Sequence, residues 1–426
     1  MKMECLNTKQ KLLQRALLAI MCVVLTGCAG RKLHWESPYK DLSSLKEGDI
    51  IHLGTGVKIT EPQLIDAIEG ARIIYVSETH DNVCSHKVQM AILKALAERY
   101  PQKIAVGMEM LKRSSQEAAD QWTSGKLDEK GFYKVWVHDW SNNFEYYRPI
   151  LRYVQAHRIP LVALRSPDEW MKKVKNADCR DQVNQDQEEL PDMDLHDPYH
   201  RALVRAVFED HPMGGMDFET FYRAQVLWDE SMAQSIAEYL QSEQGHDKKM
   251  VVFAGTHHIQ YGFGIPRRVF RRLPLSYVIV LPMTVHLPPD KTDRLMHIAA
   301  PDIPLQPGDF AWIVGYEDLE KQKVHLGVII QDTDEGVKLL GTLDNSSAQQ
   351  AGLMKNDIVV ALDDQPVKTR FDLTYLLTLK KPGDKGKIEV LRDGKPLVFD
   401  ITYQAGDLLE RAGSSTPSQA ESTKAD

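Results

Sequence analysis

The chain has 426 residues, of which 43% are apolar and 26% are charged, and its formal net charge is −8. This length and composition are typical of a globular protein with two or three domains. The negative charge argues against binding to a phosphate backbone, so we expect no nucleic-acid partner.

The N-terminal residues have the three regions of a bacterial secretion signal. A basic region at residues 9–15 precedes an apolar run, Ala16 to Leu25, that is too short to span a bilayer comfortably. The run ends in Leu25-Thr26-Gly27-Cys28, which resembles a lipobox and implies cleavage before Cys28 and lipidation of its thiol. No aspartate follows Cys28, so the resemblance implies the periplasmic face of the bacterial outer membrane. An ordinary signal peptide or a short membrane anchor is the alternative.

We therefore expect a signal peptide over residues 1–27 and a tether over 28–44. The first buried strand is predicted at Ile73 to Val76, and it ends on Ser77-Glu78-Thr79-His80-Asp81. A helix should follow from Cys84 to Tyr100, because its apolar residues repeat at helical spacing. The apolar run Ile104 to Met108 predicts a second strand that ends on Glu109. Strand, helix and strand with short connections are typical of a parallel βαβ unit.

Further strands are predicted along the chain. Leu161 to Leu164 precedes Arg165, and Met250 to Ala254 precedes Gly255-Thr256-His257-His258. Before them in the chain, the capping-box spacing of Ser114 and Glu117 follows the second strand and predicts the start of a helix. We expect Tyr277 to Leu281 to be the last strand of the sheet, and Asp309 to Val314 to add an edge strand.

Each of the main predicted strands ends on side chains that can take part in catalysis or ligand binding. The carboxyl ends of parallel strands share one edge of a sheet, and ligands bind just beyond that edge. A single strand-end histidine is more often a capping or solvated residue than a ligand, but four strand ends that agree favour a site. Its candidate residues are Glu78, His80, Glu109, Arg165, His257 and His258.

Four blocks of the sequence stand out together: Ser77 to Asp81, Met108-Glu109-Met110, Gln225 to Ala233, and Gly255 to Pro266. Together they resemble the ChaN-like family of haem-binding, iron-regulated lipoproteins, which shares a superfamily with Tiki proteases, TraB proteins and erythromycin esterases. The resemblance covers residues 45–315 and implies an α/β fold with a mostly parallel sheet flanked by helices. The family pattern is a pair of Gly-x-x-His motifs. The second is intact at Gly255 to His258, whereas Ser77 replaces the first glycine.

From Val324 the sequence changes to short strands, glycine turns and one helix. Leu326-Gly327-Val328 and the run from Asn345 to Val359 resemble a PDZ domain of the bacterial protease-associated kind, over residues 323–404. Arg392-Asp393-Gly394-Lys395 fits its last hairpin as an Asp-Gly turn. The resemblance implies a small α+β domain that binds the C-terminal peptide of a partner protein, whose carboxylate is held by Leu326, Gly327 and Val328. A spacer or dimer contact is the alternative, and residues 405–426 are expected to be a disordered tail.

The resemblance implies haem as the cofactor and a role in haem or iron uptake. Haem needs an apolar slot, an axial ligand and basic groups for its propionates. The candidates for ligation or hydrogen bonding are His80, His257, His258, Tyr261, Tyr222 and Tyr147, and those for the propionates are Arg165, Arg267 and Arg268. No spacing selects one tyrosine, and a core position is the more common explanation for each of them.

Two other functions stay open. Glu78, His80, Glu109 and His258 could hold zinc or another divalent metal, with Glu78 as the general base of a hydrolase or peptidase. Alternatively, the chain is a non-catalytic envelope adaptor that works through its PDZ domain. The residues also leave open whether the protein forms a homodimer, and whether Cys84 and Cys179 pair.

Overall fold

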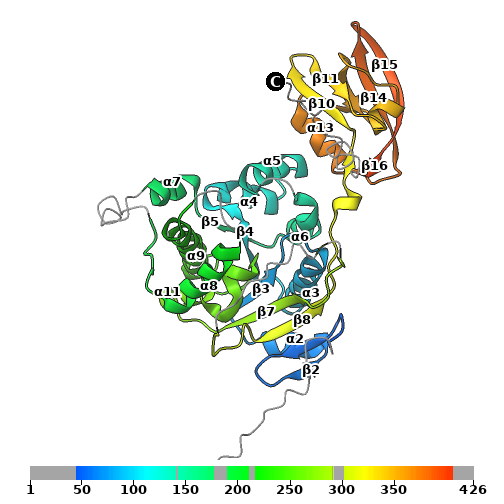
Figure 1. Cartoon of the computed structure of the whole chain (residues 1–426). Helices are drawn as coiled ribbons and strands as arrows, with labels where there is room; N and C mark the ends of the chain where they lie inside the picture. The colour runs from blue at the N-terminus through cyan, green and yellow to red at the C-terminus, as the bar shows by residue number, and fades with distance from the viewer. Residues whose placement is uncertain are drawn as a thin grey trace, which may run out of the picture. The chain divides into compact units, whose positions relative to one another are not determined.

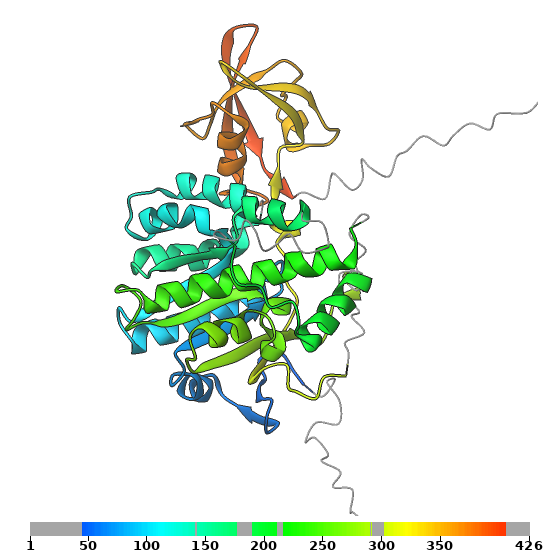
Figure 2. The ribbon, with the colours of Figure 1, turned by 90° about the vertical axis from the view of Figure 1, so that its left-hand side faces the viewer.

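The computed structural model describes residues 45–140, 143–176, 190–210, 216–289, 291 and 302–405. The expected signal peptide, the tether, Cys28, Cys179 and residues 406–426 of the expected tail lie outside this part of the chain. From Lys46 onward the described residues contain two large β-sheets (Figures 1 and 2). No helix among the described residues is long and apolar enough to cross a membrane.

The first sheet has eight strands in the order β2-β1-β8-β7-β3-β6-β4-β5. Neighbours from β8 to β5 run parallel, and β1 and β2 are added antiparallel at one end. The mostly parallel sheet confirms the expected fold class. The strands are β1 (Ile50–His52), β2 (Val57–Ile59), β3 (Ile73–Glu78), β4 (Ile104–Lys112), β5 (Leu161–Arg165), β6 (Lys249–Gly255), β7 (Tyr277–Thr284) and β8 (Phe310–Val314).

Helices cover both faces of this sheet. Alternate residues of β3 belong to different core clusters, with Ile74 and Val76 on one face and Ile73 and Tyr75 on the other. Both faces are apolar because a parallel sheet is buried on both sides. The helices are α2 (Glu61–Ile68), α3 (Val83–Arg99), α4 (Gln116–Thr123), α5 (Glu129–Trp140), α6 (Phe144–Ala156), α7 (Asp168–Asn176), α8 (Pro198–Asp210), α9 (Phe218–Gln241), α10 (Thr256–Ile259) and α11 (Ile265–Arg272).

The two helical layers come from different parts of the chain. Apolar side chains of α3, α4, α5 and α6 pack on the first face, and those of α9 and α11 pack on the second. The long helix α9 runs across its face in Figure 2. At its N-terminal end, Asp217 accepts a hydrogen bond from the backbone of Thr220 and caps the helix. Sixteen residues of α9 are buried. The helix therefore faces the protein interior on more than one side, and its apolar residues are not confined to one stripe.

Three expectations about this sheet were wrong. The second strand does not stop at Glu109 but continues to Lys112, with every residue of β4 buried. The strand at Phe310–Val314 is not an edge strand, because it lies between β7 and β1, and β7 is therefore not last. The partner strand β1 lies far away in the chain, so sequence pattern alone does not reveal this pairing.

The helix predicted after the second strand starts at Gln116. Ser115 at its N-cap makes no side-chain hydrogen bond.

The second sheet is antiparallel and has the order β10-β11-β12-β14-β15, with β13 paired to β12. Asp393 and Gly394 both have positive φ, 51° and 73°, which confirms the Asp-Gly hairpin turn between β14 and β15. The elements are β9 (Val324–His325), β10 (Val328–Thr333), β11 (Gly336–Thr342), α12 (Ser347–Gln350), β12 (Ile358–Leu362), β13 (Gln365–Pro366), α13 (Arg370–Leu377), β14 (Lys385–Arg392), β15 (Lys395–Thr402) and β16 (Gln404–Ala405).

Candidate functional site

The carboxyl ends of three central strands meet, as the sequence predicts. Glu78 at the end of β3 is in register with Gly255 at the end of β6. Glu109 in β4 reaches the same place, because its carboxylate accepts a hydrogen bond of 2.7 Å from the backbone nitrogen of Gly255. The parallel order β3-β6-β4 therefore brings both histidine motifs and Glu109 to one edge, which we call the strand-end site.

Glu78 is the most heavily bonded side chain of the strand-end site. Its carboxylate accepts hydrogen bonds from His80 Nδ1 at 2.8 Å, from Gln89 Nε2 at 2.7 Å and from the hydroxyl of Tyr147. Burial alone would raise the pKa of Glu78, but the nearby His86 and the hydrogen bonds from His80 and Tyr147 lower it to about 2. Glu78 is thus charged at neutral pH and orients His80.

One ring nitrogen of His80, Nδ1, is held by a hydrogen bond to Glu78. An ionised carboxylate only accepts hydrogen bonds, so Nδ1 of His80 carries the proton that faces Glu78. The side chain is 40% exposed, and its ring lies edge-on to Trp140 with 5.0 Å between centroids. Burial opposes a charge on His80, but Glu78 and Glu109 raise its pKa to about 9. At neutral pH the imidazole is therefore protonated, and its Nε2 also carries hydrogen.

The glycine of the second motif is needed for space. A β-carbon at Gly255 would lie 3.1 Å from Cε1 and Nε2 of His80, a distance that Cβ contacts rarely reach. The serine at position 77 of the first motif is accommodated, since Ser77 is fully buried and its hydroxyl lies 3.2 Å from that of Thr256. The two motifs are therefore in direct contact in spite of the departure from the family pattern.

His258 belongs to a second, deeper charge network. Its Nδ1 lies 2.6 Å from Asp229 Oδ1, and its Nε2 lies 3.5 Å from Glu109 Oε1. The other oxygen of Asp229 is 3.0 Å from Nε2 of His200. Burial disfavours the charged imidazole, but Glu109 and Asp229 raise the pKa of His258. Glu109 thus sits between the two networks, bonded to Gly255 and close to both His80 and His258.

Arg165 forms the outer wall of the strand-end site. Its guanidinium lies over the ring of Trp140, 4.9 Å from the centroid, and donates to the backbone oxygen of Asp139. Burial lowers the pKa of Arg165 against the opposing effect of Glu109, which places that carboxylate near the guanidinium. Trp140 thus contacts the guanidinium of Arg165 with its face and the imidazole of His80 in an edge-on arrangement, which joins a cation, an indole and an imidazole.

The other predicted ligands are placed elsewhere. His257 lies on α10, and its Nδ1 lies 3.0 Å from the side-chain amide of Gln260. Tyr261 has positive φ, 59°, and its ring stacks on Phe263. Tyr222 is 1% exposed in a separate apolar cluster with Phe218 and Phe221, and burial raises its pKa to about 12.

The two arginines of α11 that were candidates for the propionates, Arg267 and Arg268, form ion pairs with acidic side chains of the same domain. Arg268 is 1% exposed and lies 3.1 Å from the buried carboxylate of Glu230, and Arg267 pairs with Asp194 and Asp197. Both guanidinium groups therefore face acidic partners of their own.

Sequence reasoning missed the residues that hold the histidines in place. His86 and Gln89 lie three positions apart on the inward side of α3, and both reach Glu78. Asp229 and His200 support His258 from α9 and α8. Asp229 could have been found from the sequence, because it is a polar residue within the apolar face of a helix, four residues after Gln225. His200 has no such signal, because only the fold brings α8 to α9.

The expected metal ligands are close to one another but do not form a recognisable set. Among the described residues, no group of three or more His, Cys, Asp and Glu side chains is arranged to hold a metal ion. The free thiol of Cys84 is half-buried near Glu317 and is not part of the strand-end site. The assignment of Glu78, His80, Glu109 and His258 to a metal thus stays a prediction.

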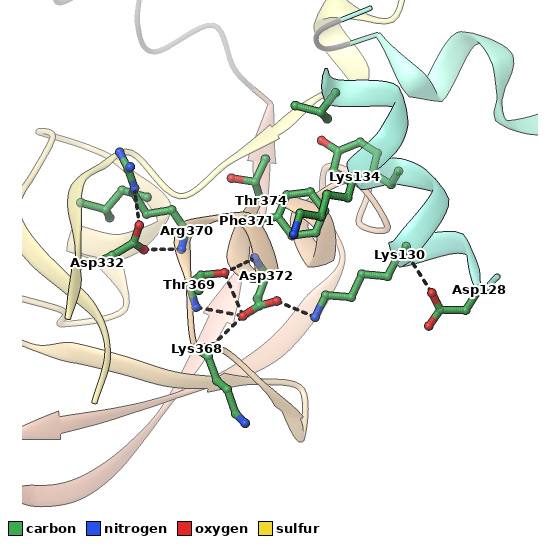
Figure 3. Close-up of a pocket in the computed structure, with 14 residues that line it drawn as sticks. Asp128, Lys130, Lys134, Asp332, Lys368, Thr369, Arg370, Phe371, Asp372 and Thr374 are labelled. Atoms are coloured by element: carbon green, nitrogen blue, oxygen red, sulfur yellow. Dashed lines mark hydrogen bonds and ion pairs between the residues drawn. The ribbon is translucent and has the colours of Figure 1, made fainter. Parts of the chain in front are cut away.

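The loop before β10 has the features that the PDZ resemblance requires. Gly327 has φ of +70°, and a β-carbon there would lie 2.3 Å from Cβ of Ser346. Leu326 is buried in the core of the second domain, and β10 is the edge strand of its sheet. Helix α13 begins with a capping box in which Thr369 and Asp372 bond reciprocally (Figure 3).

The fold and these two sites define a two-domain protein: an α/β domain with a histidine and carboxylate site at its strand ends, and a small domain with an open edge strand. Residues 64–269 match the family described as haem-binding uptake, Tiki superfamily, ChaN, and residues 324–402 match the PDZ domain. Residues 64–269 therefore form a ChaN-family domain, and residues 324–402 form a PDZ domain.

Similar solved structures cover the two domains separately. A structure described as cofacial haem binding to ChaN of Campylobacter jejuni is 16% identical, with 63% of this chain and 98% of that chain covered and a TM-score of 0.47. The HtrA-type protease AlgW with decapeptide is 20% identical over 20% of this chain and 29% of that chain, with a TM-score of 0.19.

Curated relatives include probable periplasmic serine endoproteases, DegP-like, of two Pseudomonas species. The protein of Pseudomonas putida is 30% identical over 92 residues, and that of Pseudomonas fluorescens is 33% identical over 92 residues. Each match covers 19% of this chain and 19% of the relative, so the chain spans about a fifth of these proteins.

Proposed function

We propose that the protein binds haem at the strand-end site and serves in haem or iron uptake, while its PDZ domain binds the C-terminal peptide of a partner. The observation that carries the haem proposal is His80. Its ring is fixed by Glu78 and Gly255, its Nε2 has no hydrogen-bond partner among the described residues, and the indole of Trp140 lies edge-on to it with the guanidinium of Arg165 over the indole.

These residues fit the chemistry of the group. An imidazole nitrogen is a common axial ligand of haem iron, an indole supplies an apolar wall, and a guanidinium pairs with a propionate. His80 Nε2 would ligate the iron, Trp140 would lie against the macrocycle, and Arg165 would meet a propionate. Tyr222 fits less well as a phenolate ligand, because burial raises its pKa to about 12.

We also propose the setting of this activity. The lipobox-like sequence at Cys28 supports an anchored lipoprotein at the periplasmic face of the outer membrane. The edge strand β10 and the positive φ of Gly327 support capture of a C-terminal carboxylate by the loop at Leu326 to Val328.

A haem titration followed at the Soret band tests the proposal. We expect saturable binding that His80→Ala weakens at least tenfold. His246→Ala is the matched control, since His246 precedes β6 and lies at the opposite end of that strand. Unchanged binding in His80→Ala would show that His80 is not the ligand. The absence of any saturable change in the Soret band would contradict haem binding itself.

Hydrolysis is a second candidate, favoured by the pairing of His80 with a buried carboxylate. A histidine oriented by an acid is a common general base. In this arrangement the base would be His80 rather than Glu78, because the oxygens of Glu78 already accept three hydrogen bonds. Since the pKa of His80 is raised to about 9, its imidazole would act as a base only at alkaline pH and as a general acid at neutral pH. Peptidase or esterase activity in the haem-free protein, lost in both Glu78→Gln and His80→Ala, would favour hydrolysis. A protein without either activity that still retains a partner peptide would be an adaptor.

A further inference from the structure

The PDZ domain has a cavity next to the edge strand where a partner peptide would add. A peptide that pairs antiparallel with β10 and places its carboxylate at Leu326 to Val328 runs toward the end of β10. That end is marked by Asp332, whose carboxylate lies 3.0 Å from Arg370 at the start of α13. The upstream residues of the peptide therefore approach the first turn of α13.

The first domain supplies the opposite wall of this cavity. A cavity of about 920 Å³ is lined by β10 and α13 on one side and by α5, with Tyr133 and Lys134, on the other (Figure 3). The ring of Tyr133 is 5.5 Å from that of Phe371, and Lys130 Nζ is 2.6 Å from Asp372 Oδ1. Apolar and ionic contacts both hold α5 against the helix that borders the peptide.

The charges that line the cavity are not balanced. Its three carboxylates are all engaged: Asp332 by Arg370, Asp372 by Lys130, and Asp128 by the backbone of Gly131. Lys134 points from α5 toward Phe371 and has no ion-pair partner among the described residues (Figure 3). Its ammonium group is exposed, so a carboxylate that enters the cavity would meet an unneutralised cation.

We propose that α5 is part of the peptide site and that Lys134 selects partners with an acidic side chain four to six residues before their carboxyl end. This inference rests on the proposed peptide binding of the PDZ domain. A strand advances about 3.3 Å per residue, so four to six residues are needed to pass from the loop at Gly327 to the end of β10. The partner is thus a protein tail with a free carboxylate, an apolar end and an acidic segment upstream.

The test is a selection from a random octapeptide library with free carboxyl ends, using the purified protein. We expect enrichment of apolar residues at the last position and of Asp or Glu four to six positions from the end. In Lys134→Glu this acidic preference should change to Lys or Arg. In Lys126→Glu, which alters an exposed lysine outside the cavity, it should stay the same.

Binding constants for two selected peptides that differ only upstream provide the second measurement. The peptide with Glu should bind the protein about two- to fivefold more tightly than the peptide with Lys, the range expected for an exposed ion pair. Enrichment confined to the last three positions would overturn the role of α5 and leave PDZ binding intact. A selection without any enrichment at the carboxyl end would overturn the proposed peptide binding itself.

Discussion

The imidazole of His80 lies directly against the α-carbon of Gly255, so that the histidine of the first motif occupies the space above the glycine of the second. The contact arises because β3 and β6 are parallel neighbours and Glu78 is in register with Gly255. The two motifs are 175 or more residues apart in the chain, yet each completes the other.

Gly255→Ala should displace His80. The added methyl group meets the ring at 3.1 Å, and overpacking of this kind costs about 1–3 kcal/mol. We expect haem affinity to fall about tenfold while the fold is retained, as measured by Soret titration and circular dichroism. Gly70→Ala is the control, because no atom lies within 4 Å of a β-carbon there. Equal affinity in both variants would show that the position of His80 does not matter.

Haem affinity should rise with pH between 7 and 9. The pKa of His80 is raised to about 9, so below this pH a proton occupies Nε2 and must leave before iron can bind there. The expected gain is up to about tenfold per pH unit, and it should vanish in His80→Ala. Titrations at pH 7, 8 and 9 measure it. An affinity that is higher at pH 7 than at pH 9 would contradict ligation by His80.

Glu78 should make the protein sensitive to acid. Its pKa is lowered from 4.5 to about 2, so its stabilising effect is complete above about pH 4.5 and is lost as the pH falls toward 2. Glu78→Gln should therefore remove on the order of 2 kcal/mol from the decrease in unfolding free energy between pH 6 and pH 3. Urea unfolding at both pH values measures the difference. The exposed Glu243→Gln should keep the wild-type decrease.

Asp229→Asn should uncouple two buried histidines. The carboxylate of Asp229 faces both His258 and His200, and its own pKa is strongly lowered because those imidazoles and Arg268 outweigh burial. We expect a loss of about 3 kcal/mol in stability and a fall in the pKa of His258. NMR titration of the His258 ring and chemical unfolding measure these effects. In Asp120→Asn, on the exposed side of α4, both quantities should be unchanged.

The sequence by itself predicts the strands that form the strand-end site and the residues at which they end. Apolar runs that stop on Glu78 and on Gly255 mark buried strands, and parallel pairing turns their ends into one edge. The PDZ hairpin at Asp393-Gly394 was equally readable, because only a few residues tolerate two successive positive φ values. Such features depend on neighbours in the chain, where side-chain pattern and backbone preference are sufficient.

The tertiary structure alone decided which side chains act on the histidines. Asp229 and His200 come from separate helices, and Glu78 gains its low pKa from His86, His80 and Tyr147, which lie on three different segments. The strand β8 was expected at the edge of the sheet but lies in its interior. Its partner β1 lies more than 250 residues away in the chain, so this pairing too depends on the tertiary structure. A pKa and a strand neighbour both depend on distances in space, which spacing along the chain does not specify.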